Sequence, residues 1–333
     1  MTNCRICGNE RENIPYIVKE MMLGSRDEFE YFKCVSCGCL QIKDYPANLS
    51  KYYPDQYYSF NPPGEQEGLR DFFSLYLKRQ RTNYHISSNN WLGFAIALLR
   101  STGFSPMWDW FRFSSTSTNS KILDVGCGGG KLIYELYLDG FTDLWGIDPF
   151  IPSSLSTDNL KVIKGELADI TGNFDFIMLH HSFEHMADQL TALNNLFRLL
   201  KPQCYLLIRI PVIGYAWRKY GVSWCQLDAP RHFYIHTTAS MEILAKKAGF
   251  EIRKVVYDST AAQFIASEDY QRNISPMDSP CHLMAGNGTE QEIPRLSEAE
   301  IKRFVDEAIR LNESNDGDQA CFYLYKPTEH ITD

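Results

Sequence analysis

The middle of the chain alternates short apolar runs with stretches in which apolar residues recur at helical spacing. The segment "KILDVG" at 121–126 is a run of apolar and β-branched residues, typical of a buried strand. The segment "GKLIYELYLDG" at 130–140 has helical spacing and ends on a glycine, which predicts a helix with a C-cap. The segment "LWGID" at 144–148 predicts the next strand. This unit indicates a doubly wound parallel sheet, which binds its ligand at the turn after the first strand.

Residues 61–120 predict a connector between this sheet and the start of the chain. The segment "NPPGEQEG" at 61–68 interrupts regular structure, and "LRDFFSLYLKRQ" at 69–80 and "WLGFAIALLRST" at 91–102 then show helical apolar spacing. The aromatic cluster "MWDWFRF" at 107–113 is expected to pack in the core or between subunits. A substrate lid and a membrane-surface foot are the alternatives for that cluster.

Four cysteines near the N-terminus form two C-x2-C pairs, each followed by a glycine. They are Cys4, Cys7, Cys34 and Cys37. Two residues between thiols allow a tight knuckle that aims both sulfurs at one point, and two knuckles supply the four ligands of a tetrahedral structural zinc site. The segments "YIVKEM" at 16–21 and "EYFKCV" at 30–35 predict a hairpin between the knuckles. The pattern therefore predicts a small zinc ribbon, with Cys39 as a bystander.

Composition limits the partners and the compartment. The chain has 333 residues and a formal net charge of −8, and residues 1–60 hold seven Lys and Arg against eight Asp and Glu. A ribbon that grips nucleic acid needs a basic face, so we expect a structural ribbon and no nucleic-acid binding. No apolar run approaches the roughly 20 residues of a membrane span. Ten cysteines without a visible signal peptide favour a reducing compartment, which predicts a cytoplasmic protein.

The turn after the first predicted strand holds Gly126, Gly128 and Gly130 between two acids. A dinucleotide fingerprint would place its last glycine one residue later, and a phosphate-binding P-loop would end in Lys followed by Ser or Thr, whereas leucine follows the lysine here. Asp124, directly before the turn, would repel a pyrophosphate and suits a cationic amine. Asp148, at the end of the second strand, suits the hydroxyls of a ribose. S-adenosylmethionine carries an amine, a positive sulfur and a ribose, so it is the predicted cofactor.

These features resemble the class I S-adenosylmethionine-dependent methyltransferases, whose first two motifs are matched by "LDVGCGGG" at 123–130 and "GIDP" at 146–149. The resemblance implies a Rossmann-like α/β fold with a seven-stranded, mostly parallel sheet and an antiparallel last strand, "ACFYLYK" at 320–326. It also implies that Glu166 and Leu167 lie at the purine and that His181 lines the cofactor.

Within that family the chain most resembles bacterial enzymes that carry an N-terminal zinc-binding domain, among whose relatives are sugar C-methyltransferases of deoxysugar pathways. The segments "APRHFYIHT" at 229–237 and "GDQACFYLYK" at 317–326 fit this group, but the larger C-terminal domain of the sugar enzymes is missing. We therefore expect methyl transfer to a small molecule, most readily a sugar or nucleotide-linked sugar. The alternatives are a ribosomal-RNA methyltransferase that grips RNA with its ribbon and a non-catalytic cofactor-binding scaffold.

Methyl transfer to oxygen or carbon requires removal of a proton from the acceptor, and histidine titrates near neutral pH. His185 follows the fourth strand and His232 follows the fifth, on the rim that faces the methyl group. His232 is the expected base, with a structural hydrogen bond as its alternative role, and His185 is its competitor. Arg231 is expected to hold an anionic substrate group, and Tyr57 and Tyr58 to reach the substrate.

The sequence thus predicts three parts: a zinc ribbon over 1–60, a helical connector or lid over 61–118, and a methyltransferase domain over 119–328. A helix at 297–312 is expected before the last strand. The sequence leaves open a homodimer, the methylated molecule, and transfer to oxygen, nitrogen or carbon.

Overall fold

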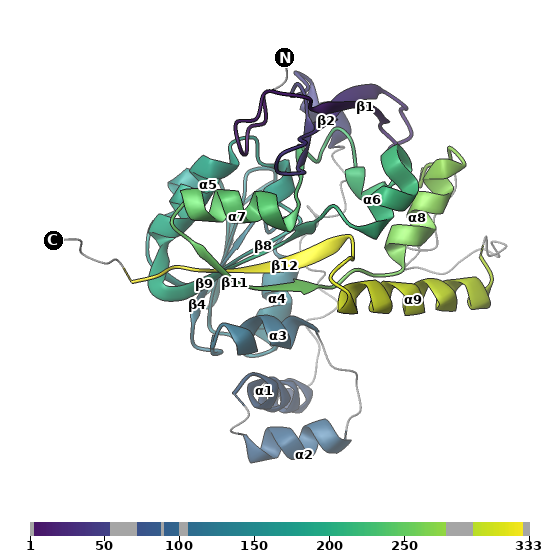
Figure 1. Ribbon diagram of the computed structural model, residues 1–333. Helices are drawn as coiled ribbons and strands as arrows, with labels where there is room; N and C mark the ends of the chain where they lie inside the picture. Colours follow the sequence, from purple (N-terminus) through teal and green to yellow (C-terminus); the bar gives the residue numbers. More distant parts are fainter. Residues whose placement is uncertain (1–2, 54–71, 88–89, 100–105, 278–295, 329–333) are drawn as a thin grey trace.

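An eight-stranded sheet forms the centre of the computed structural model, in the order β11-β12-β9-β8-β4-β5-β7-β6 (Figure 1). The structure describes residues 3–53, 72–87, 90–99, 106–277 and 296–328. The strands are β4 (Lys121–Val125), β5 (Asp143–Asp148), β6 (Leu155–Ser156), β7 (Leu160–Lys164), β8 (Phe174–His180), β9 (Leu200–Pro211), β11 (Glu251–Tyr257) and β12 (Gln319–Tyr325). The two-residue β6 is an edge addition to the seven predicted strands.

The sheet is parallel through its middle, where β9, β8, β4, β5 and β7 pair in that order. The last strand, β12, is antiparallel to both of its neighbours, as expected. Helices cover both faces, with α5 and α7 on one side and α3 and α4 on the other (Figure 1). They are α3 (Pro106–Phe113), α4 (Lys131–Leu138), α5 (Gln189–Leu199), α6 (Tyr215–Tyr220), α7 (Thr238–Lys247), α8 (Ala262–Gln271) and α9 (Glu298–Glu313).

The apolar run of β4 is explained by burial on both faces. Ile122 and Leu123 are neighbours in the strand, so their side chains point to opposite faces of the sheet. Ile122 packs in one apolar cluster and Leu123 in the other, and both are fully buried. A central strand of this kind needs apolar residues at consecutive positions and shows no alternation. Because these strands are parallel, their carboxyl ends lie together at one edge of the sheet, and the glycine turn follows β4 at that edge.

The N-terminal ribbon is a second sheet, made of β1 (Ile14–Lys19), β2 (Glu28–Lys33) and β3 (Leu40–Ile42). Its hairpin strands begin two residues earlier than the sequence pattern predicts. A fourth strand, β10 (Tyr234–Ile235), comes from the chain that follows β9 and pairs with β3. Figure 1 shows the ribbon in purple over the end of the main sheet. The ribbon is therefore joined by backbone pairing to the α/β part of the molecule, and the predicted boundary near residue 60 stays a prediction.

Two further helices, α1 (Phe72–Ser87) and α2 (Trp91–Leu99), lie beyond α3 and farthest from the ribbon (Figure 1). In α3, Phe111 is fully buried and its ring packs against Phe141 and Phe176, so the aromatic cluster contributes to the core as expected. Across the described ranges, no helix combines the length and the apolar character that crossing a bilayer demands.

Candidate active site

The glycine turn joins β4 to α4 at the edge where the parallel strands end. Gly126, Gly128 and Gly130 have φ angles of 75°, 54° and 87°, a region that residues with a Cβ rarely adopt. A Cβ on Gly126 would lie 2.3 Å from the Cβ of Ser182, which follows β8. The turn is therefore glycine-rich because its backbone is left-handed and packs directly against the neighbouring loop.

Asp148 ends β5 and holds the glycine turn from the adjacent strand. Its Oδ2 accepts a hydrogen bond from the backbone N–H of Gly128 at 3.0 Å, and its Oδ1 accepts one from Phe150 at 2.8 Å. The side chain is buried. A carboxylate fixed at the end of a strand in this way has lone pairs left to accept hydrogen bonds from a ligand's hydroxyl groups.

Asp124 lies within β4, directly before the turn, and is almost completely buried. Among the described residues its Oδ1 has no hydrogen-bond partner. Burial, followed by repulsion from Asp148, raises the pKa of Asp124 to about 7. A buried carboxylate without a partner is costly, and a cationic group placed beside it would relieve the cost. The turn and its two acids therefore fit the sulfonium, amine and ribose of S-adenosylmethionine.

The other predicted cofactor residues lie at the ends of neighbouring strands. Glu166 is exposed and Leu167 half-buried, at the start of the short helix η4 (Leu167–Asp169) after β7. His181 follows β8 with a φ of 52°. Its Nε2 accepts a hydrogen bond from Arg209 at 2.9 Å, and its Nδ1 lies 3.5 Å from Oε1 of Glu184. These placements leave the predicted contacts with the cofactor as predictions.

Glu184 is the centre of a group of titratable side chains that the sequence patterns did not single out. It lies in η5 (Phe183–His185) and is fully buried. Its ligand atom and those of His185 and His232 all lie within 4.8 Å of one another. We call these three residues the Glu184 cluster. The fold thus joins the two histidines that were predicted as base and competitor, with their ring centroids 4.7 Å apart.

Hydrogen bonds to backbone carbonyls fix the tautomers of both histidines. His232 Nδ1 lies 2.8 Å from the carbonyl oxygen of Gln226, and His185 Nδ1 lies 2.8 Å from that of Arg231. Because a carbonyl oxygen can only accept, each Nδ1 carries the hydrogen and each Nε2 keeps a lone pair. Burial lowers the pKa of His232 to about 4, so its imidazole is neutral near pH 7.

A pair of opposite charges, Arg231 and Asp228, lies beside the Glu184 cluster. Arg231 is buried and donates a hydrogen bond to Oδ1 of Asp228, whose Oδ2 lies 3.6 Å from His232 Nε2. The predicted anion-binding arginine therefore already faces a carboxylate. Burial would raise the pKa of Glu184, but the neighbouring histidines, His181 first, outweigh it and hold the pKa at about 2.

Tyr53, which was not predicted, reaches this site. The predicted substrate contacts Tyr57 and Tyr58 lie outside the described residues. Tyr53 Oη lies 3.1 Å from His185 Nδ1, and its ring stacks on Phe150 with centroids 5.7 Å apart. The backbone N–H of Phe150 in turn donates a hydrogen bond to Asp148. Tyr53 therefore links the Glu184 cluster to the cofactor side of the site.

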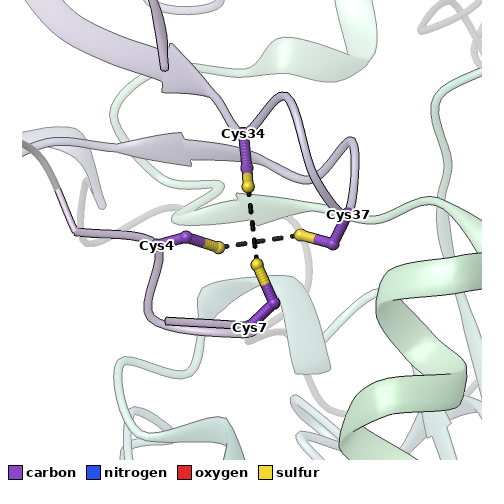
Figure 2. Close-up of side chains that lie close together, drawn as sticks. All are labelled: Cys4, Cys7, Cys34 and Cys37. Atoms are coloured by element: carbon purple, nitrogen blue, oxygen red, sulfur yellow. Dashed lines mark hydrogen bonds between the residues drawn. The ribbon is translucent and has the colours of Figure 1, made fainter. Parts of the chain in front are cut away.

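The four ribbon cysteines come together as predicted (Figure 2). The Sγ atoms of Cys4 and Cys37 are 3.6 Å apart, and those of Cys7 and Cys34 are 3.5 Å apart. Sulfurs at about 2.3 Å from one tetrahedral zinc ion lie about 3.8 Å from each other. The arrangement therefore fits a zinc ion, which these cysteines would hold. We call these four residues the cysteine cluster.

Neighbouring groups stabilise one thiolate of the cysteine cluster, that of Cys4. The hydrogen bond with Cys37, assisted by the backbone N–H of Cys7, lowers the pKa of Cys4 to about 4, whereas the same hydrogen bond raises the pKa of Cys37 and burial raises that of Cys34. Gln41, which is fully buried, donates from Nε2 to Cys4 Sγ at 2.9 Å. Metal-binding sulfur must be deprotonated, so these contacts favour metal binding. The sequence patterns did not indicate the role of Gln41, which lies just after the second knuckle.

The ribbon also touches the loop that carries His232. Tyr31 Oη donates to the backbone carbonyl of His232 at 2.9 Å, and the N–H of Ile42 donates to that of Phe233 at 2.9 Å. Thr237 Oγ1 donates to the carbonyl of Cys37 at 2.6 Å. The ribbon therefore positions the backbone on both sides of β10.

Comparison with known proteins bears on the fold. Residues 101–255 match a family described as a methyltransferase domain. With the sheet topology, this match confirms the predicted class I methyltransferase fold, whereas the predicted domain bounds of 119–328 stay a prediction. The ubiquinone biosynthesis O-methyltransferase of Bartonella bacilliformis is 32% identical over 114 residues, which cover 31% of this chain and 45% of that protein. The chain thus spans less than half the length of this curated relative.

Two other similar proteins cover more of their own length or of this chain. The ubiquinone biosynthesis O-methyltransferase of Azorhizobium caulinodans is 25% identical over 177 residues, or 46% of this chain and 68% of that protein. Among solved structures, a phosphoethanolamine N-methyltransferase 2 of Haemonchus contortus, in complex with phosphomonomethylethanolamine and S-adenosylhomocysteine, has 18% identity and a TM-score of 0.39. The match covers 75% of this chain and 61% of that one.

Proposed function

We propose that this protein transfers a methyl group from S-adenosylmethionine to a hydroxyl-bearing small molecule. The observation that carries the proposal is the buried Oδ1 of Asp124, which has no partner among the residues that the structure describes. It lies directly before a left-handed glycine turn that Asp148 holds in place. Asp124 would offset the positive charge of the cofactor, and Asp148 would accept hydrogen bonds from its ribose. The bound cofactor supplies a methyl group activated by the sulfonium.

The proposed acceptor is a hydroxyl compound because the relatives are named ubiquinone biosynthesis O-methyltransferases. The resemblance to sugar C-methyltransferases implies a sugar or nucleotide-linked sugar but does not by itself favour oxygen over carbon. Arg231, Tyr57 and Tyr58 are the proposed substrate contacts. The sugar, a cytoplasmic location and a homodimer stay predictions.

We place removal of the acceptor's proton at the Glu184 cluster. Nε2 of His232 carries a lone pair, and the neutral imidazole is in the protonation state that a base requires. His232→Ala should keep the affinity for S-adenosylhomocysteine and lose about 10²–10⁴-fold in turnover. His185→Ala is the comparison, and normal turnover by the His232 variant would remove it from this role.

Calorimetry with S-adenosylhomocysteine tests the cofactor assignment. Asp148→Ala removes up to two charge-assisted hydrogen bonds to ribose, each worth about 1.5–3 kcal/mol, so binding should weaken by at least tenfold. Asp158→Ala, which removes an exposed carboxylate beyond β5, is the control and should bind normally. Wild-type protein that binds a nicotinamide dinucleotide and not S-adenosylhomocysteine would contradict the proposal.

The ribosomal-RNA alternative makes a different prediction. Steep salt dependence is the mark of a protein that neutralises several phosphates, and the near-neutral composition of residues 1–60 gives no basic face for this. Filter binding to ribosomal-RNA fragments should therefore show no tight, salt-sensitive complex. A steep salt slope would favour the RNA alternative over a small-molecule acceptor.

A further inference from the structure

We infer that the Glu184 cluster is a divalent-cation site that binds the hydroxyl group of the methyl acceptor. This inference rests on the proposed methyl transfer and adds to it a metal and a class of acceptor. Glu184, His185 and His232 offer one carboxylate and two imidazoles with ligand atoms within 4.8 Å of one another. Two histidines and one carboxylate suit Zn²⁺, Mn²⁺ or Fe²⁺ and leave coordination positions open for other ligands.

The first argument is the state of the Glu184 carboxylate. Its side chain is fully buried, and neither carboxylate oxygen has a hydrogen-bond partner within the part of the chain that the structure describes. The nearest imidazole nitrogens, on His181 and His232, are 3.5 Å and 3.8 Å from Oε1. Because Nε2 of His181 accepts from Arg209, its Nδ1 carries a hydrogen and gives Oε1 one contact, longer than the usual N–H···O hydrogen bond. A buried carboxylate left in this way is expensive unless it is paired or coordinates a metal.

The second argument is the direction of the imidazole lone pairs. Because Nδ1 of each histidine donates to a backbone carbonyl, Nε2 of His232 presents a lone pair toward Oε1 of Glu184, 3.8 Å away, and Oδ2 of Asp228, 3.6 Å away. Oε1 of Glu184, Oδ2 of Asp228 and Nε2 of His232, which can only accept hydrogen bonds, then lie side by side. Metal-ligating histidines characteristically donate their other ring N–H to a carbonyl, as His185 and His232 both do.

The spacing suits a cation after a small contraction. Two ligand atoms about 2.1 Å from one cation lie about 3.0–3.4 Å apart. Oε1 of Glu184 and Nε2 of His232 would therefore approach each other by about half an ångström from their 3.8 Å separation. The ligand atom of His185, which lies within 4.8 Å of the other two, would have to move farther. A single positive charge would then satisfy the Glu184 carboxylate and the lone pair of His232 at once.

The site lies on the methyl-transfer side of the fold. His181, which follows β8, lies 3.5 Å from Glu184. Tyr53 contacts His185 and stacks on Phe150, whose N–H donates to Asp148. A hydroxyl of the acceptor bound to the cation would have a lowered pKa, so the Glu184 cluster would assist removal of the proton through the cation, and the proton would pass to water. The loss of turnover expected for His232→Ala would then report the loss of a ligand. The acceptor oxygen then forms the new O–CH₃ bond while the carbon–sulfur bond breaks, and its electron pair leaves with the neutral thioether.

Titration of the full-length, zinc-loaded protein with Mn²⁺, followed by electron paramagnetic resonance, tests the inference. Wild type should bind about one Mn²⁺ per chain, in addition to ribbon zinc. Glu184→Gln keeps the side-chain shape, removes the charge and should weaken Mn²⁺ binding at least tenfold. Glu242→Gln, which changes an exposed glutamate on α7, is the matched control and should bind Mn²⁺ like wild type.

The absorption spectrum of bound Co²⁺ distinguishes an ion at the cysteine cluster from an ion at the Glu184 cluster. Co²⁺ at the cysteine cluster gives strong thiolate charge-transfer absorption, whereas Co²⁺ bound by nitrogen and oxygen ligands does not. Co²⁺ added to the zinc-loaded protein should show only the weaker bands, and Glu184→Gln should abolish them. If that variant does not fold, His185→Asn, at a half-buried position, replaces it in both titrations.

Binding of S-adenosylhomocysteine separates the two possible failures. Wild type that binds S-adenosylhomocysteine but neither Mn²⁺ nor Co²⁺ overturns the cation site and leaves the proposed function standing. Wild type that does not bind S-adenosylhomocysteine overturns the proposed function itself. Glu184→Gln that folds and binds Mn²⁺ as tightly as wild type also overturns the cation site.

Discussion

The cysteine cluster and the Glu184 cluster are both groups of metal-ligating side chains, but they are assembled in opposite ways. The cysteine cluster comes from two local knuckles, each of which sets its own geometry through a left-handed glycine, Gly8 or Gly38. The Glu184 cluster joins η5 to a residue before β10 that is far away in the sequence. Local assembly leaves a recognisable motif in the sequence, and tertiary assembly does not.

The two clusters also differ in their surroundings. Around the cysteine cluster the backbone N–H groups and Gln41 point toward sulfur and favour thiolate. Around the Glu184 cluster the carbonyls of Gln226 and Arg231 accept the imidazole N–H groups, and the lone pair of His232 faces carboxylate. The first environment fits a structural ion, and the second, under the proposed cation site, would keep ligand atoms available to an acceptor. The contacts of Tyr31 and Thr237 join the two, and the predictions below test how strongly.

The largest expected effect comes from removing a cysteine ligand. Cys34→Ser should lose zinc and destabilise the protein by more than about 4 kcal/mol, because the knuckles and the β3–β10 pairing depend on the ion. Zinc content and thermal unfolding measure this. Cys39→Ser, at a buried thiol outside the cluster, should keep about one zinc per chain. A Cys34 variant with full zinc content would remove Cys34 from the ligand set.

The next prediction separates backbone strain within a knuckle from the packing of that knuckle against Thr237. Gly8 and Gly38 have nearly equal φ angles, 79° and 75°, so alanine costs each knuckle about 1–2 kcal/mol of strain. A Cβ on Gly38 would also lie 2.9 Å from Cγ2 of Thr237, whereas one on Gly8 meets nothing within 4 Å. Gly38→Ala should therefore cost about 1 kcal/mol more in chemical denaturation. Equal losses would mean that the Thr237 contact adds no stability.

The same contrast explains what the sequence could predict. The central sheet follows from apolar runs such as that of β4 and from the turn motif, and the cysteine cluster follows from the C-x2-C spacing. The strand β10 was not predictable, because two residues carry no periodicity and their pairing with β3 depends on the tertiary fold. Glu184 stands beside His185 in the sequence, yet only its burial and its distance to His232 show that it belongs to the site.

A third acidic position, Asp124, predicts a pH dependence that the cysteine cluster should not share. Its folded-state pKa of about 7 is raised above the unfolded value, so its proton stabilises the free protein at low pH, and this contribution is lost as the pH rises through about 7. The cationic amine, which S-adenosylhomocysteine shares with S-adenosylmethionine, prefers the ionised carboxylate. Affinity for S-adenosylhomocysteine should therefore fall by up to about tenfold per pH unit below about 7.

Calorimetry from about pH 8 down to about pH 6 measures this dependence. Asp124→Asn cannot ionise, so its weaker binding should lack this pH dependence. Zinc content should stay constant over the same range. Wild-type affinity that does not change between these pH values would show that Asp124 is not the group that faces the cofactor's charge.

The smallest expected effect tests the connection between the two clusters directly. Tyr31 is buried in β2, and its Oη donates to the carbonyl of His232, so Tyr31→Phe removes one hydrogen bond and leaves the ring in place. The loss should be about 1 kcal/mol in stability. Zinc content should not change, because Tyr31 contributes no ligand atom. If the ribbon positions the Glu184 cluster through this contact, Mn²⁺ affinity should fall in Tyr31→Phe and not in Tyr16→Phe, a half-buried tyrosine on the paired strand β1. Unchanged Mn²⁺ affinity in both variants would mean that the ribbon stabilises the fold without setting the geometry of the acceptor site.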